Sequence, residues 1–196
     1  MYRPTTLMTA LTLTTALIAA APAARAGDLA VEGYAGLTAP NSMFMTNEHL
    51  DFRSGQAYGL GVYYTGVAGW EFGADLMYSE ADFDQPGPNR ISSTSLMAVA
   101  RKVFETAGPV DYYLGAGLGV IDVAWRSDGP WSVLEDSERV TGGQLSAGLR
   151  YELSPAASLF TEAKYQRAFG AARVTTSDVE AEFRRTTLAT GLRYAF

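Results

Sequence analysis

The chain has 196 residues, a net charge of −6, no cysteine and one histidine, His49. The acidic balance argues against a nucleic-acid partner, which would need a basic stripe, and the lack of cysteine excludes a disulfide framework. The length fits one domain, and 20 glycines with 11 tyrosines favour an all-β chain over a helical one.

The first residues, MYRPTTLMTALTLTTALIAAAPAARA, have the pattern of a secretory signal peptide. Arg3 precedes an apolar stretch, and Ala24-Arg25-Ala26 forms an A-x-A cleavage site. The apolar stretch is too short for a retained transmembrane helix. We therefore assign residues 1–26 to the signal peptide and 27–196 to one exported domain, whose net charge becomes −8 because two arginines are lost with the signal.

Cleavage after Ala26 is a direct prediction of this pattern. The exported protein should begin at Gly27, and mass spectrometry of its N-terminus checks this. Finding Met1 or Tyr2 at the start of the membrane-inserted form would reject the assignment.

Eight later segments alternate apolar residues with small or polar ones, as β-strands do. Each is close to the roughly 9–11 residues with which a tilted strand crosses a bilayer. None approaches the roughly 18 apolar residues of a spanning helix. The segments are Leu29 to Leu37, Ala57 to Thr65, Trp70 to Ser79, Thr94 to Phe104, Asp111 to Ile121, Gly143 to Leu153, Ser158 to Phe169 and Arg185 to Phe196.

The connections between these segments alternate in length. Three are short turns: Thr65 to Gly69, Glu105 to Pro109 and Leu153 to Ala157. Four are long and polar: Thr38 to Gln56, Glu80 to Ser93, Asp122 to Thr141 and Gly170 to Arg184. Short turns on one side and long loops on the other are typical of membrane barrels. We predict an all-β fold, an eight-stranded antiparallel up-and-down transmembrane β-barrel.

The alternation separates an apolar row from a polar row rich in glycine. The polar row has equal numbers of acids and bases: Glu32, Glu71, Asp75, Arg101, Gln144, Arg150, Glu152, Glu162, Lys164, Arg185 and Arg193. A soluble lipocalin-like barrel would turn the apolar row inward. A solvent-facing row has no need of glycine, however, whereas the narrow interior of eight strands does. The polar row is therefore predicted to face inward and the apolar row to face lipid.

Charges inside such a barrel must pair, because their desolvation is costly. We expect an interior charge network of Glu32, Glu71, Asp75, Arg101, Arg150, Glu152, Glu162, Lys164 and Arg193. Within it, Glu71 and Asp75 are expected to meet Arg101. Arg150 and Glu152 are expected to meet Glu162 and Lys164. Both sets of pairs depend on the strand register.

Aromatic residues gather at the short-turn ends of the strands, where they predict a girdle at one membrane surface. These are Tyr64, Trp70, Phe104, Tyr112, Tyr151 and Phe196. Lys102 interrupts the apolar row beside a short turn, where it can reach the interface. The alternative is a soluble core whose aromatics flank β-turns.

The C-terminal segment GLRYAF ends in an aromatic-x-Phe pattern. Together with YYLGAGLGV and GLRYEL, it resembles the small OmpA-like and opacity-type outer-membrane β-barrels, also called small porin-family proteins. The resemblance implies location in the outer membrane of a Gram-negative bacterium, in contact with its lipid and lipopolysaccharide. It also implies that Tyr194 and Phe196 form an assembly signal, read by the barrel assembly machinery.

Sequence motifs for metals, nucleotides or cofactors are not found, and we expect no cofactor. Some barrels of this kind modify lipid A with a His and a Ser near the outer rim, so His49 with Ser79, Glu80 and Asp82 is a conceivable catalytic set. The sequence around His49 does not match the motifs of these lipid A-modifying enzymes. We therefore favour a histidine in a solvated loop. The acid-rich stretches SEADFDQPGPN and LEDSER lack EF-hand spacing and favour solvated loops over a calcium site.

The leading functional hypothesis is a non-enzymatic outer-membrane barrel whose outer loops serve a structural or adhesive role, or contact a host, phage or surface ligand. A narrow channel or a conduit for small hydrophobic molecules is the alternative, although eight strands argue against a wide pore. A lipid A-modifying enzyme is the third hypothesis, and it depends on His49.

Overall fold

The computed structural model describes residues 29–40, 43–45, 48–50, 54–82, 89–128, 133–170, 172–174, 179–181 and 183–196. The predicted signal peptide lies outside these ranges, so its cleavage stays a prediction. Within the described ranges, no helix is long and apolar enough to cross a membrane.

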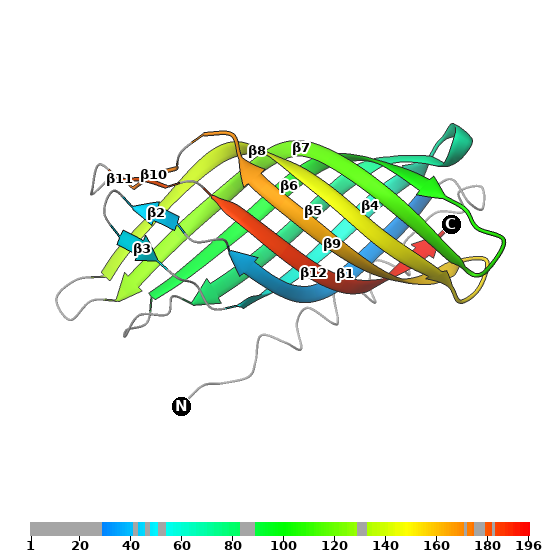
Figure 1. Cartoon of the computed structure of the whole chain (residues 1–196), viewed down its shortest axis with the longest axis horizontal. Coiled ribbons are helices and arrows are strands. Elements are labelled where there is room, and N and C mark those ends of the chain that lie inside the picture. Colours follow the sequence, from blue (N-terminus) through cyan, green and yellow to red (C-terminus); the bar gives the residue numbers. More distant parts are fainter. Residues whose placement is uncertain are drawn as a thin grey trace, which may run out of the picture.

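Eight long strands close into a barrel (Figure 1). They are β1 Leu29–Pro40, β4 Gly55–Thr65, β5 Trp70–Asp82, β6 Asn89–Phe104, β7 Val110–Asp128, β8 Val133–Glu152, β9 Ala157–Ala168 and β12 Arg184–Ala195. Each pairs antiparallel with the next, and β1 closes the ring by pairing with β12. The predicted eight-stranded antiparallel up-and-down barrel is confirmed.

The two ends of the barrel differ in their connections, as the sequence predicted. At one end, the short-turn end, lie the three short turns and the C-terminus (Figure 1). One of these turns holds the 3-10 helix η1, Val67–Gly69. At the other, the long-connection end, lie two small hairpins: β2 Met43–Met45 with β3 Glu48–Leu50, and β10 Ala172–Val174 with β11 Val179–Ala181.

The strands run further toward the long-connection end than the sequence predicted. The stretch Asp122 to Thr141, expected as a loop together with its LEDSER segment, is mostly strand, because β7 continues to Asp128 and β8 begins at Val133. Residues in this extension remain paired, with Ser127 opposite Leu134. The backbone ladder continues beyond the apolar alternation, so the alternation alone underestimates the length of these strands.

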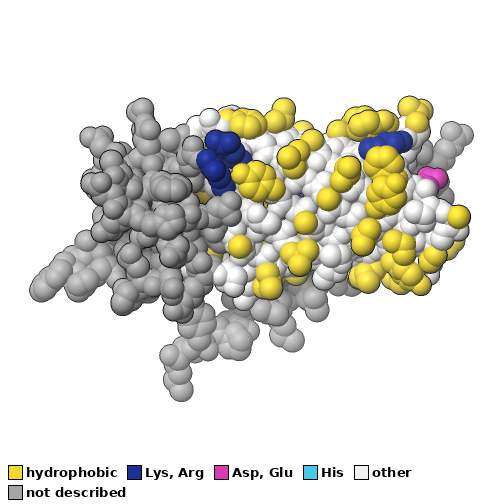
Figure 2. Space-filling model, viewed as in Figure 1, with side chains coloured by type: hydrophobic (Ala, Val, Ile, Leu, Met, Phe, Trp, Pro, Cys, Tyr) yellow, Lys and Arg dark blue, Asp and Glu magenta, His cyan; other side chains and the backbone are white. Residues whose placement is uncertain are grey.

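The barrel is apolar outside and charged inside, as predicted. Leu118 is 64% exposed and Leu192 60%, whereas Arg101 on the inner face is 1% exposed. Figure 2 shows hydrophobic side chains spread over the outer surface of the described barrel, with few charged ones among them. The lipocalin-like alternative is therefore wrong, and this exterior suits a bilayer.

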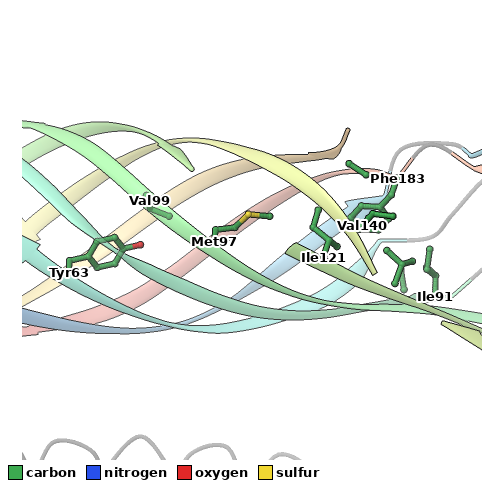
Figure 3. Packing of buried hydrophobic residues seen from close by; sticks show 10 residues of the cluster. Tyr63, Ile91, Met97, Val99, Ile121, Val140 and Phe183 are labelled. Carbon is green, nitrogen blue, oxygen red and sulfur yellow. The ribbon is translucent and has the colours of Figure 1, made fainter. Parts of the chain in front are cut away.

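The interior is less uniformly polar than expected. Apolar side chains share the inward positions and form a buried cluster that runs along the lumen (Figure 3). Its larger members are Tyr63, Ile91, Met97, Val99, Ile121, Val140 and Phe183. The sequence prediction assigned charges and glycines to this face and passed over Tyr63, Met97, Val99 and Ile121, which alternate in step with them. It placed Ile91, Val140 and Phe183 in long loops, so they were not considered for the interior.

The predicted girdle residues lie at the short-turn end. Tyr64 and Tyr112 are exposed on the outer face. Phe104 stacks on Tyr112 with 4.9 Å between ring centroids, and Tyr194 meets Phe196 edge-on at 5.0 Å. Lys102, in the same region, donates a hydrogen bond from Nζ to the carbonyl oxygen of Ala68 in η1.

Candidate functional site

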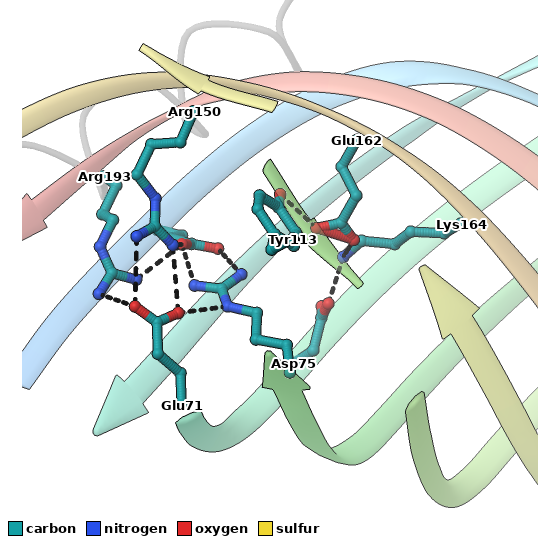
Figure 4. Close-up of polar contacts among 9 residues, drawn as sticks. Glu71, Asp75, Tyr113, Arg150, Glu162, Lys164 and Arg193 are labelled. Carbon is teal, nitrogen blue, oxygen red and sulfur yellow. Dashed lines mark hydrogen bonds and ion pairs between the residues drawn. The ribbon is translucent and has the colours of Figure 1, made fainter. Parts of the chain in front are cut away.

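The interior charges form two groups (Figure 4). The first, which we call the arginine cluster, lies toward the short-turn end and consists of Glu32, Glu71, Arg101, Arg150 and Arg193. Its members come from β1, β5, β6, β8 and β12, whose alternation turns each of them inward. The cluster therefore ties five strands together across the lumen.

Two carboxylates in this cluster are shared by three guanidinium groups. Arg101 donates from Nε to Glu71 Oε2 at 2.5 Å and from Nη1 to Glu32 Oε2 at 3.0 Å. Arg193 bridges the same two carboxylates, at 2.9 Å to Glu32 and 2.8 Å to Glu71. Arg150 lies 3.1 Å from Glu71. Such charge-assisted hydrogen bonds offset the desolvation of the buried groups.

The second group, the lysine cluster, consists of Asp75, Glu162 and Lys164. Lys164 pairs with Asp75 and lies 3.5 Å from Glu162. Tyr34 donates its hydroxyl hydrogen to Asp75 at 2.5 Å, and Tyr113 donates to Glu162 at 2.7 Å. The arginine cluster has one excess positive charge and this cluster one excess negative charge, so together they balance.

The expected pairs formed only in part. Glu71 meets Arg101, as predicted, but Asp75 pairs with Lys164 instead. Arg150 likewise reaches Glu71 and not Glu162. The register explains the first difference, because Glu71 lies directly opposite Arg101 whereas Asp75 lies opposite Met97. Long side chains then cross the lumen to partners on distant strands.

Glu152 was predicted in the network and lies outside both clusters. It is the last residue of β8 and is exposed at the short-turn end, opposite Ser158. Alternation along β8 puts it on the same face as Arg150, but at this position the strand has already passed the filled part of the barrel. Alternation alone therefore wrongly assigned Glu152 to the interior network.

Inward aromatic rings, which the sequence prediction missed, shape both clusters. Four of them lie over a glycine directly opposite on the neighbouring strand: Tyr34 over Gly59, Tyr63 over Gly73, Tyr113 over Gly148 and Phe160 over Gly191. A Cβ atom on Gly148 would come within 2.3 Å of Tyr113 Cζ. The glycines thus make room for rings that in turn hold charges, as where Arg101 stacks 3.6 Å from the Tyr63 ring centroid.

Replacing Gly148 by valine should destabilise the barrel by about 1–3 kcal/mol, because the new side chain overpacks the lumen and displaces Tyr113 from Glu162. Urea unfolding in lipid vesicles measures the change. The matched control is Ala147→Val, whose side chain points outward and should change stability little. Equal losses in the two variants would mean that Tyr113 does not depend on this glycine.

A third polar layer lies nearer the long-connection end, around Arg185. This arginine is buried in the structure and donates to Ser95 at 3.0 Å and to Gln166 at 2.7 Å. It also donates to Ser79 and Ser93. Within the described ranges its partners are neutral oxygens. The sequence analysis placed Arg185 on the inward face but left it out of the charge network.

The predicted catalytic set is not brought together around Ser79. That serine is buried in the lumen, 3.0 Å from Ser93 and bonded to Arg185. Glu80 and Asp82 pair with Arg90 on the exterior. His49 lies in strand β3, opposite Phe44, and not in a loop as expected; its side chain is outside the described part of the structure.

Residues 9–196 match the family model described as "Outer membrane protein beta-barrel domain". Among solved structures, Neisserial surface protein A (NspA) is similar, with 19% identity, a TM-score of 0.62 and coverage of 88% of this chain and 100% of that one. The outer membrane protein AlkL has 13% identity, a TM-score of 0.55 and coverage of 90% and 94%. A major outer membrane protein from Thermus thermophilus has 11% identity, a TM-score of 0.54 and coverage of 84% and 99%. A comparison with curated proteins finds no match.

The closed barrel, its apolar exterior and its filled polar interior define an integral outer-membrane β-barrel protein of the Gram-negative type. The chain belongs to the outer membrane protein beta-barrel domain family. In such barrels the short turns face the periplasm and the long connections face the exterior. The short-turn end is therefore the inner end of this barrel.

Proposed function

We propose that the protein is a non-enzymatic barrel that presents its long connections at the cell surface for adhesion or contact with another molecule. One observation carries the proposal. Strands β7 and β8 have 19 and 20 residues, whereas β9 and β12 have 12 each, so a paired hairpin projects at the outer end. A paired ladder of this kind is a stiff platform for display.

The base of this projecting hairpin, residues 122–139, is tied across its two strands. Arg139 and Asp122 are directly opposite and share two hydrogen bonds of 2.7 and 3.1 Å. The lumen below is occupied by the arginine cluster, the lysine cluster and the Arg185 layer. That filling favours a role at the outer surface over transport through the barrel.

A hairpin truncation tests the surface role. Trp125 lies opposite Asp136, so residues 126–135 can be replaced by Asn-Gly, which closes a two-residue turn. Bacteria expressing the truncated protein should have a normal level of folded barrel and lose the adherence to epithelial cells that the full protein confers. A matched control alters the inner turn at Thr106 and Gly108 and should adhere normally. Undiminished adherence of the truncated form, or no gain from the full protein, would refute the proposal.

The enzyme hypothesis has a separate test. Ser79 is held inside the barrel by Ser93 and Arg185, which does not support its use as a nucleophile at the rim. Mass spectrometry of lipid A from expressing cells should therefore show no change. A new lipid A species that disappears in a His49→Ala variant would instead favour the enzyme.

A further inference from the structure

The lipid-facing surface has an open groove of about 810 Å³ that crosses strands β5 to β9. Three outward alanines, Ala98, Ala100 and Ala116, are among its lining residues, and we call them the alanine floor. Larger apolar residues, among them Phe72, Leu145 and Phe169, also line it. Elsewhere on this face outward positions often hold leucines or aromatics, so the alanines create a depression in the apolar belt.

The groove leads obliquely toward the outer end of the barrel. A row of residues that lie directly opposite one another on neighbouring strands follows the groove. It passes from Ala98 to Leu118, then to Gly143 and Arg167. Ala98 lies near the middle of β6, whereas Arg167 is the second-last residue of β9 at the outer end. Because strands of such barrels tilt by roughly 35–45°, this row rises from within the bilayer to its outer interface.

Positive charge lies at the outer end of the groove. Arg167 is exposed and lines the groove, and Arg184 on β12 is directly opposite it. Figure 2 shows a group of Lys and Arg side chains beside hydrophobic ones near this end of the described surface. Two guanidinium groups in opposed positions attract an anion to this end of the groove. Both arginines make other contacts too, and each has five N–H donors to share.

We propose that this groove binds one phosphorylated lipid of the outer leaflet. An acyl chain lies on the alanine floor, and the headgroup phosphate meets Arg167 with Arg184. Guanidinium groups bind phosphate through paired hydrogen bonds, which fixes the headgroup. Lipid tails surround the whole barrel, so transfer of the acyl chain from the bilayer to the groove contributes little by itself. The acyl chain is stabilised mainly by the close van der Waals contact that it makes in the depression.

Native mass spectrometry of the folded barrel with added bis-phosphorylated lipid A tests the site. We expect one retained lipid, weaker retention of the same lipid after its phosphates are removed, and about tenfold weaker binding in Arg167→Gln. Ala98→Leu should also weaken binding by filling the floor, and Ala116→Leu provides a second floor variant.

The matched controls Arg139→Gln and Ala35→Leu change an exposed arginine and an outward alanine away from the groove and should bind normally. Heat-modifiability gels check that each variant is folded.

Two results would overturn the proposal. Binding that is the same in Arg167→Gln and Arg139→Gln, or the same with and without lipid phosphates, would show that the headgroup is not recognised. Loss of binding in Arg167→Gln without loss in either floor variant, together with full displacement by inorganic phosphate, would show a surface anion site with no role for the groove.

Discussion

Replacing Arg101 by methionine should lower the free energy of unfolding by about 3–5 kcal/mol, because a buried arginine that two carboxylates share is lost. Glu32 and Glu71 would then share Arg150 and Arg193 as their partners among the described residues. Urea unfolding of the barrel in lipid vesicles measures the loss. Arg139→Met is the matched control: its side chain is 72% exposed and pairs with Asp122, and exposed pairs contribute roughly 0–1 kcal/mol.

A double-mutant cycle sharpens this test. Arg101→Met and Glu71→Gln should be strongly coupled, because the two side chains share a 2.5 Å ion pair. Arg101→Met and Asp75→Asn should be close to additive, since Asp75 is held by Lys164 and Tyr34. Strong coupling to Asp75 and none to Glu71 would mean that the register of β5 against β6 is wrong.

Replacing Phe196 by alanine should have a large effect in cells and a small one on the purified barrel. The ring lies at the short-turn end and meets Tyr194, so its loss should cost only part of the roughly 3–5 kcal/mol of a fully buried phenylalanine. If the terminal aromatics are the assembly signal that the family resemblance implies, the variant should refold from urea into detergent yet fail to reach the outer membrane. Heat-modifiability gels of the refolded protein measure folding, and the same gels of membrane fractions measure how much folded protein reaches the outer membrane.

Phe104→Ala is the matched control for this prediction. Phe104 is also an aromatic of the short-turn end, stacked on Tyr112, but it is far from the C-terminus in sequence. Its variant should lose similar stability and still reach the outer membrane. Normal membrane levels of Phe196→Ala would refute the assembly role.

The sequence predicted the strands well because each membrane-crossing segment has one lipid face. Leu114, Ala116 and Leu118 alternate with glycines in β7, and the structure turns these three outward. The same rule failed from Asp122 onward, where charged residues such as Asp122 and Arg126 interrupt the apolar alternation. Hydrogen bonding continues there without a sequence pattern to reveal it.

The interior was harder to predict, because its contacts cross the lumen. Asp75 and Lys164 lie on strands that are not neighbours, so no local pattern joins them. The tyrosine–glycine pairs were hidden for a different reason. Tyr113 and Gly148 can be recognised as a pair only once the register is known, because the two residues lie on different strands.

The central claim is that the polar row faces inward and fills the barrel. Planar-bilayer recording of folded monomer, with insertion checked by heat-modifiability, tests it most directly. We predict no steady conductance, because Arg101, Lys164 and Arg185 with their partners occupy successive levels of the lumen. A stable, reproducible channel whose conductance changes in Lys164→Ala would contradict the claim.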